Sequence, residues 1–204
     1  IHIWQSAAAI LFLLLASSVY LSTVGTKAET DLLQQYIPIA EMRSLTLPDG
    51  TKVQLNSKST LLYPQEFTGD SRSVFLLGEA NFKVKPDKKR PFIVKSNDLQ
   101  ITALGTEFNV SAYPESQEIA TTLISGSIRV DYNNLTTSVI LHPNEQFAYN
   151  RNNKKYDLSN PDMDDVTAWQ RGELVLQKMT LTDIINVLER KYPYAFVYSL
   201  SLIH

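Results

Sequence analysis

Apolar and polar residues alternate with a period of two along most of the chain, in short runs separated by turn residues. This pattern is typical of half-buried β-strands, whose successive side chains point to opposite faces of a sheet. The first two runs, residues 44–47 and 51–55, flank Pro48-Asp49-Gly50, where Pro presets φ and Gly accepts the positive φ of a hairpin turn. Further runs lie at residues 59–63, 74–77, 80–84, 92–95, 100–104, 107–112, 120–124, 127–131, 138–141 and 146–149.

No amphipathic helical pattern interrupts these runs. Short strands that follow one another at spacings near ten residues are typical of all-β architectures. The sequence therefore predicts a mainly β protein, with an all-β domain over residues 44–158 that is built either as a solenoid or as a sandwich.

The first 26 residues have a different pattern, because they contain no Lys, Arg, Asp or Glu. Residues 3–24 meet the length of about 20 apolar residues that a helix needs to cross a bilayer, and Trp4 and Tyr20 lie near the two ends, where aromatic rings favour the headgroup layer. We predict a transmembrane helix over residues 1–26 and a polar linker over 27–43. A cleavable signal peptide, with a small-x-small site at Thr26-Lys27-Ala28, or a buried helix are the alternatives.

The hydrophobic period changes after the acidic stretch 159–165, which reads as a domain boundary. Thr180 is expected to be the N-cap of a helix, with Asp183 three residues later in a variant of the capping box. The apolar residues that follow have helical spacing: Leu181, Ile184, Ile185 and Leu188. With strands expected at residues 173–177 and 195–198, the sequence predicts a β-α-β module over residues 159–204 that is truncated at its C-terminal end.

Composition gives little support for catalysis or nucleic-acid binding. A net charge of −2 provides no basic field for a phosphate backbone. The chain has no Cys and three His, two of them at its ends, so thiol, Fe–S and His-based metal sites are disfavoured. Asp162, Asp164 and Asp165 lack the Gly and terminal Glu of a calcium loop. We expect no catalytic, cofactor or metal site and hence no enzymatic activity, and we expect no direct nucleic-acid partner.

Aromatic residues in the predicted strands leave one other function open. Stacking platforms for sugars are built from exposed aromatic rings, although such rings more often serve packing. The residues that could form a platform are Tyr113, Tyr132, Phe147 and Tyr149. The alternative function is therefore a membrane-anchored, periplasmic carbohydrate-binding β domain.

Four blocks resemble the core pattern of the FecR family: GEANFKV at residues 78–84, PFIV at 91–94, ALGTEFNV at 103–110 and LISGSIRV at 123–130. Residues 45–56 resemble the opening hairpin of that family, and residues 141–146 resemble its late turn, with Asn144 where Gly is expected. Residues 169–198 resemble the short secretin/TonB N-terminal module that follows in part of the family. On this resemblance the motif residues with structural roles are Gly78, Phe82, Leu104, Gly105, Thr106, Phe108, Gly126 and Trp169.

The resemblance implies a single-pass anti-sigma factor of the bacterial inner membrane, with the residues after about 26 in the periplasm. Its implied partners are an extracytoplasmic-function sigma factor, bound through a cytoplasmic domain expected before residue 1, and the signalling module of a TonB-dependent outer-membrane transporter. The protein would thus control genes for glycan or iron-siderophore uptake. If the module pairs by strand addition, Phe196, Val197 and Tyr198 are the expected interface residues.

Overall fold

The computed structural model describes residues 11–18, 20, 31–177 and 179–196, and the chain divides into two units, Ile1–Asp31 and Leu32–His204. In the first unit, residues 11–18 and 20 are helical. Within the described residues, no helix combines the length and the hydropathy that a membrane crossing requires. The predicted transmembrane helix lies largely outside the described residues, so it stays a prediction.

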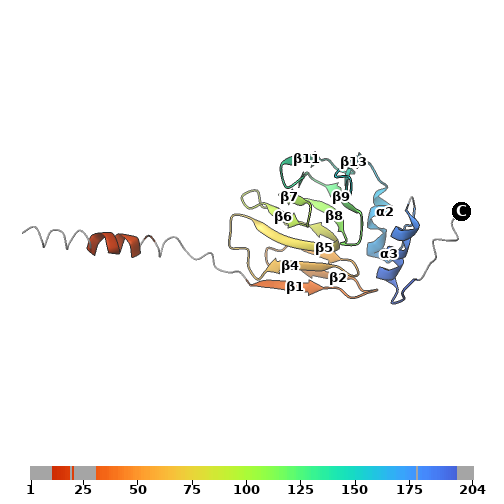
Figure 1. Cartoon of the computed structure of the whole chain (residues 1–204), viewed down its shortest axis with the longest axis horizontal. Coiled ribbons are helices and arrows are strands. Elements are labelled where there is room, and N and C mark those ends of the chain that lie inside the picture. The colour runs from red at the N-terminus through yellow and green to blue at the C-terminus, as the bar shows by residue number, and fades with distance from the viewer. Residues whose placement is uncertain (1–10, 19, 21–30, 178, 197–204) are drawn as a thin grey trace, which may run out of the picture. The chain divides into compact units, whose positions relative to one another are not determined.

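The second unit is built on one 13-stranded sheet that curls (Figure 1). Its strands are β1 (Leu32–Tyr36), β2 (Arg43–Thr46), β3 (Lys52–Leu55), β4 (Thr60–Pro64), β5 (Arg72–Lys83), β6 (Phe92–Lys95), β7 (Gln100–Ala103), β8 (Glu107–Ala112), β9 (Glu118–Ser125), β10 (Ile128–Tyr132), β11 (Thr137–Leu141), β12 (Gln146–Asn150) and β13 (Tyr156–Ser159). The mainly β fold that the alternation predicts is thereby confirmed.

Strand β5 belongs to both halves of the sheet. Its N-terminal part pairs with β4 and, in parallel, with β6, whereas its C-terminal part pairs with β3 and β8. Gly78 lies at the change of partners with φ +106°, and a Cβ at this position would lie 2.7 Å from Cα of Ser59. Only glycine can adopt this φ while the backbone of Ser59, directly before β4, lies so close. Gly78 therefore allows β5 to pair with different strands on its two sides.

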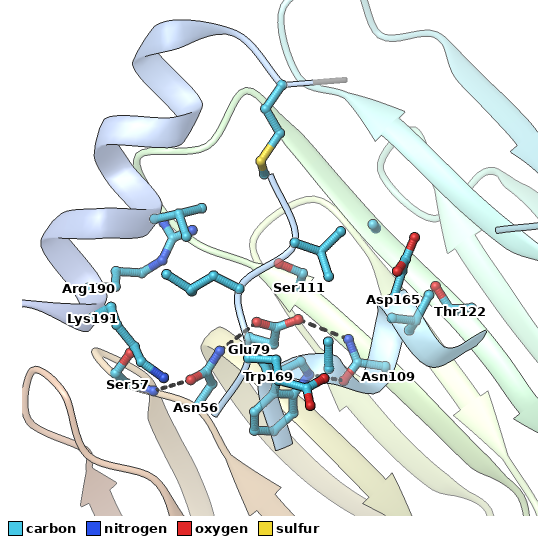
Figure 2. A pocket seen from close by; sticks show the side chains of 18 of the residues that line it. Asn56, Ser57, Glu79, Asn109, Ser111, Thr122, Asp165, Trp169, Arg190 and Lys191 are labelled. Atoms are coloured by element: carbon cyan, nitrogen blue, oxygen red, sulfur yellow. Dashed lines mark hydrogen bonds between the residues drawn. The ribbon is translucent and has the colours of Figure 1, made fainter. Parts of the chain in front are cut away.

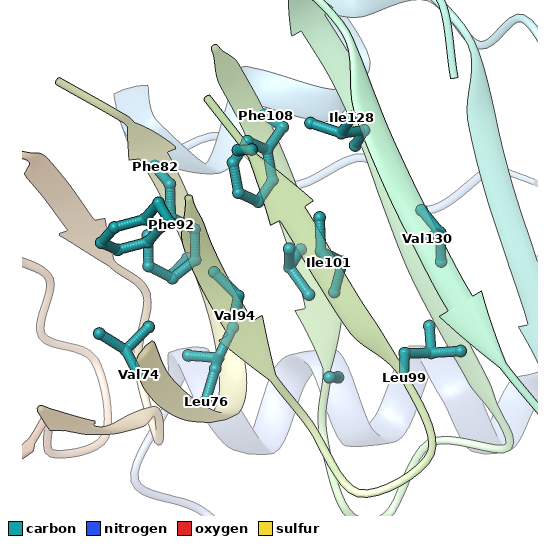
Figure 3. Close-up of a cluster of buried hydrophobic side chains, with 14 of the residues drawn as sticks. Val74, Leu76, Phe82, Phe92, Val94, Leu99, Ile101, Phe108, Ile128 and Val130 are labelled. Carbon is teal, nitrogen blue, oxygen red and sulfur yellow. The ribbon is translucent and has the colours of Figure 1, made fainter. Parts of the chain in front are cut away.

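Strands from both halves of the sheet contribute side chains to one core (Figure 3). Phe82 of β5 stacks on Phe108 of β8 with ring centroids 5.4 Å apart and contacts Phe92 of β6. At the other side of the core, Tyr132 of β10 contacts Phe147 of β12 across the half-sheets. The architecture is a curled open sheet, whereas the sequence analysis expected either a solenoid or a sandwich.

Three strands differ from the sequence-based expectation. The runs at 74–77 and 80–84 are one strand, β5, because Gly78 bends the strand without ending it. Strand β1 lies in the stretch predicted as a linker, and its sequence LLQQY places like residues side by side and hides the period of two. Strand β13 was also not predicted from the sequence. Its side chains are largely exposed at a sheet edge.

Three short helices follow the sheet: α2 (Met163–Thr167), η1 (Ala168–Arg171) and α3 (Leu181–Lys191). The predicted cap of α3 is confirmed, because Thr180 Oγ1 accepts from the N–H of Asp183 at 3.2 Å. The acidic stretch expected as a domain boundary leads into α2, where Asp162 accepts from the N–H of Asp164. The domain boundary itself stays a prediction. Figure 1 shows α2 and α3 together beside β8 and β9.

The predicted β-α-β module is wrong in its first strand. Residues 173–177 are irregular and pair with no strand among the described residues. Alternation indicates which side chains would share a face, but it cannot supply the neighbouring strand that backbone hydrogen bonding requires. Of the second predicted strand, Ala195 and Phe196 are irregular, and Val197 and Tyr198 lie outside the described residues.

Candidate functional site

A polar cavity lies between the outer face of the sheet and the C-terminal segment, which we define as residues 163–196. The strands carry polar residues on this face because their apolar partners at alternate positions point into the core. The cavity has a volume of about 220 Å³ (Figure 2). The polar residues that the strands and the β3–β4 turn contribute to its lining are Asn56, Ser57, Glu79, Ser111, Asn109, Thr122 and Gln146.

Glu79 of β5 is the charged centre of this face. Asn56 Nδ2 donates to its Oε2 at 2.8 Å, and Asn109 Nδ2 donates to its Oε1 at 3.0 Å (Figure 2). Burial raises the pKa of the Glu79 carboxyl, while the two amide hydrogen bonds and the positive charge of Arg190 act in the opposite direction. Each carboxylate oxygen thus has a fixed donor, as a buried charge requires.

The two amides are themselves held as donors. Asn56 Oδ1 accepts from the N–H of Ser57 at 2.8 Å, and Asn109 Oδ1 accepts from Trp169 Nε1 at 3.3 Å. Rotating either amide would turn its oxygen toward the carboxylate and lose both hydrogen bonds. Trp169 lies in η1, so the C-terminal segment completes the hydrogen-bond network that surrounds Glu79.

Arg190 of α3 contacts two connections between strands of the sheet, at Tyr113 and Glu115 and at Ala40. Its guanidinium lies 3.8 Å from the ring centre of Tyr113, and its Nη1 lies 2.8 Å from Glu115 Oε1. Its carbonyl accepts from the N–H of Ala40 at 3.0 Å. The stacked ring is itself fixed, because the buried Tyr113 hydroxyl donates to the carbonyl of Ser57 at 2.9 Å. One residue therefore attaches the end of α3 to two parts of the β body, which we define as residues 32–159.

The C-terminal segment leaves much apolar surface uncovered. No residue of α3 is fully buried although the helix is amphipathic. The exposed large apolar residues of this segment are Leu174, Leu176, Met179, Leu181, Tyr192, Tyr194 and Phe196, with 37% to 71% of their surface accessible. Contiguous exposed apolar surface marks interaction sites, so this segment is a candidate interaction surface.

The predicted motif residues lie in different parts of the structure and do not form one site. Gly78 lies in β5 at the change of partners, Phe82 and Phe108 fill the core, and Trp169 contacts Asn109 at the cavity. Leu104 lies at the surface, 48% exposed.

The remaining glycines of the motif pack closely against other residues. A Cβ on Gly105 would lie 2.8 Å from Cα of Pro86, and a Cβ on Gly126, whose φ is +92°, would lie 2.6 Å from Cγ2 of Thr106. The late turn behaves as its sequence suggests, because Asn144 takes the positive φ of 69° that the family's Gly would adopt.

The predicted interface residues are only partly described. The N–H of Phe196 donates to Glu189 Oε1 at 3.3 Å, and its side chain is 38% exposed. Val197 and Tyr198 lie outside the described residues. The interface at Phe196, Val197 and Tyr198 stays a prediction.

The aromatic platform of the alternative function is not formed. Tyr113, Tyr132, Phe147 and Tyr149 are each at most 5% exposed and pack inside the molecule. Among the described residues, no group of three His, Cys, Asp or Glu side chains is placed to hold a metal ion.

Sequence reasoning missed Glu79, Asn56, Asn109 and Arg190 as a group. Glu79, Asn109 and Arg190 are polar residues within strands or a helix and Asn56 directly follows β3, so none stands out alone. The available signal was the residue type: Glu79 and Asn109 lie in strands, where Glu and Asn are disfavoured, and both fall within blocks of the family resemblance.

Known proteins share sequence and fold with this chain. The family model described as FecR protein matches residues 37–129. Two crystal structures of a candidate anti-sigma factor from Parabacteroides distasonis, at 2.50 and 1.65 Å resolution, are each 37% identical to this chain, with TM-scores of 0.77 and 0.76. The alignments cover 80% and 79% of this chain and 76% and 75% of those chains. No curated protein matches the chain.

Proposed function

Because the chain belongs to the FecR family of anti-sigma factors, we propose that it is a single-pass signal transducer of the bacterial inner membrane. In this proposal residues 1–26 cross the bilayer and the residues after about 26 lie in the periplasm. The neutral leader supports this assignment, because residues 3–24 have the length and composition of a membrane-spanning helix. The β body and the C-terminal segment then form the receiving part of the molecule.

The sigma factor follows from membership of the family, whereas its subclass and the second partner are our inference. We propose that the chain controls an extracytoplasmic-function sigma factor and that the signalling module of a TonB-dependent outer-membrane transporter binds its periplasmic part. Controlled genes would then serve the uptake of a glycan or an iron-siderophore. In this role the protein acts by binding and has no enzymatic activity.

The observation that carries the proposal is the attachment of the C-terminal segment. Its apolar side chains are exposed, while Arg190 and Trp169 fasten it to a polar sheet face around Glu79. A partner that covers the apolar side chains would gain the free energy of burying them. The same partner would contact α3, which Arg190 attaches to the β body. Binding at the segment could thereby change the contacts between α3 and the β body.

Binding tests this proposal. The chain in detergent micelles is titrated with purified signalling modules of TonB-dependent transporters from the same genome, and affinity is measured by biolayer interferometry. Tyr194→Asp is expected to weaken the complex about tenfold or more, because it places a charge in the apolar surface. Leu135→Asp alters an exposed apolar side chain of the β10–β11 turn and serves as the matched control.

A complex that forms with any one module, and that tolerates L135D but not Y194D, is the expected result. If no module binds, the transporter part of the proposal is wrong. If both variants bind like the wild type, the partner binds elsewhere and the C-terminal segment is not the receiving surface.

A further inference from the structure

Strand β1 forms an edge of the sheet with few of the features that normally protect such edges. Among the described residues it pairs with β4 alone, in an uninterrupted antiparallel register from Leu32 to Tyr36. Its sequence, LLQQY, contains no charged residue and no proline. Free edges usually carry Lys, Pro or a bulge, because an unprotected row of N–H and C=O groups pairs readily with another strand.

The backbone groups that face this free edge follow from the register. The N–H of Ile37 donates to the carbonyl of Ser59 at 2.9 Å, so Ile37 directs its backbone groups toward β4. Hydrogen-bonded and non-hydrogen-bonded pairs alternate along an antiparallel ladder. Leu32, Gln34 and Tyr36 therefore direct their N–H and C=O groups to the free edge. The pairing of Leu32 with Pro64, which has no N–H, agrees with this alternation.

The free edge is complementary to a second copy of itself. In an antiparallel pair centred on Gln34, Leu32 lies opposite Tyr36 of the other copy, and the two Gln34 residues face each other across the symmetry axis. All three residues share the outer face of the sheet, because Gln34 pairs with Leu62 and Leu62 pairs with the exposed Phe75. We propose that β1 pairs with β1 of a second copy of this chain and forms a two-fold symmetric dimer.

Three features support this occupant. Three hydrogen-bonded pairs would give about six backbone hydrogen bonds between the copies. Leu32 and Tyr36, which are 50% and 52% exposed, would cover each other on both sides of a central pair of glutamines. Leu33, which is 39% exposed, would lie opposite Gln35 on the other face. Every apolar side chain of the strand thus gains a neighbour, and no charge is buried.

The other edges fit self-pairing less well. Strand β2 carries Arg43 and strand β13 carries Asp157, so charges protect both. Strand β11 is uncharged, but centring a pair on Val139 would place the exposed Ile140 opposite Ser138 and leave it without an apolar neighbour. Among the strand edges that the structure describes, β1 has the most self-complementary sequence.

The dimer would also set the spacing of the two N-terminal units. Strand β1 begins at Leu32, directly after the first unit. In the proposed register the two Leu32 residues lie roughly 14 Å apart, from the rise per residue and the spacing of neighbouring strands. The two N-terminal units would therefore start close together, and any change in pairing at β1 would change their separation.

Cysteine cross-linking tests the dimer and its register, because the chain has no native cysteine. The full chain in detergent micelles is oxidised with copper phenanthroline as the variants Gln34→Cys and Gln35→Cys. Gln34→Cys is expected to give a covalent dimer, since the paired Cα atoms lie about 5.5 Å apart. Gln35→Cys alone is expected to give little product, because Gln35 faces Leu33 of the other copy. A mixture of Leu33→Cys and Gln35→Cys chains is expected to cross-link.

A second substitution separates pairing at β1 from association through the leader. Tyr36→Lys, in the Gln34→Cys background, adds a charge to the edge and is expected to reduce cross-linking at least about fivefold. Melting curves under reducing conditions check that each variant is folded. Equal cross-linking of Gln34→Cys and Gln35→Cys would overturn the proposal, because association through the leader gives no such register. Absence of cross-linking in both the Gln34→Cys variant and the mixture would also overturn it.

Discussion

At the scale of single residues, the ion pair between Arg72 and Asp49 stabilises the β body from within. The side chain of Arg72 is 1% exposed, and its Nη1 lies 2.7 Å from Asp49 Oδ2. The guanidinium also donates to the carbonyls of Arg90 and Lys85, and Asp49 accepts from the N–H and hydroxyl of Thr51. These bonds join the first hairpin turn to the loop before β6, so the pair acts as a cross-link between distant segments.

Arg72→Met should therefore reduce the free energy of unfolding by about 3–5 kcal/mol, because it leaves the carboxylate of Asp49 buried without its cation. Urea denaturation measures this loss. Arg43→Met removes an arginine whose ion pair with Glu41 is exposed, and it should cost roughly 0–1 kcal/mol. Equal losses in the two variants would show that the buried pair adds nothing beyond an ordinary surface contact.

The raised pKa of Glu79 predicts a pH dependence of stability. The folded state disfavours the charged form of the Glu79 carboxyl. The contribution of the neutral Glu79 carboxyl to the free energy of unfolding is therefore fully present below its ordinary pKa and is lost as the pH rises through its raised pKa. Lowering the pH from 8 to 5 should thus favour the wild type over Glu79→Gln. Urea denaturation of both proteins across this range measures the difference. Glu118, whose pKa burial also raises, is present in both proteins and largely cancels. A difference independent of pH would contradict the assignment.

Sequence patterns anticipated some of these residues but not their partners. Pro48-Asp49-Gly50 predicts a turn, and Asn144 was expected to replace a left-handed Gly; both are found. The partner of Asp49 is Arg72, 23 positions away, and no local rule connects them. The surroundings of Glu79 likewise depend on the fold, which brings Asn56, Asn109 and Trp169 together around its carboxylate.

At the scale of elements, α3 was predictable as a helix, whereas its attachment was not. The cap at Thr180 and the helical spacing of Leu181, Ile184 and Leu188 are local features, and the helix begins where they place it. The contacts of Arg190 with Tyr113 and Glu115 depend on how the sheet curls. Residues 173–177 give the opposite case, in which a pattern suited to a strand has no pairing strand in the described part of the chain.

Arg190→Ala should release the end of α3 from the sheet while the β body stays folded. Amides of residues 184–190 are expected to exchange with deuterium about tenfold faster or more, because the helix alone is too short to be stable. Hydrogen-exchange mass spectrometry measures this, with peptides of β5 and β8 as internal references. Arg129→Ala, which removes an exposed arginine on β10, should leave α3 unchanged. Unaltered exchange in R190A would mean that other contacts hold the helix.

At the scale of the whole molecule, the second unit, residues 32–204, presents two distinct surfaces. The C-terminal segment presents apolar side chains beside the Glu79 cavity, and β1 presents an uncharged edge directly after the first unit. The family could be predicted from the sequence because its motif glycines occupy positions where backbone or neighbouring side chains leave no room for a Cβ. The curled sheet could not, because short strands in this order fit a solenoid equally well.

The most direct test of the account is signalling in the cell. A reporter for the cognate sigma factor is measured with and without the substrate of the transporter, in cells that carry the full-length protein as wild type, Y194D, R190A or L135D. The account predicts a response for the wild type and L135D, and at least about a tenfold loss of the substrate-dependent response for Y194D and R190A at equal protein levels. A full response in both Y194D and R190A would contradict the claim that the C-terminal segment receives the signal.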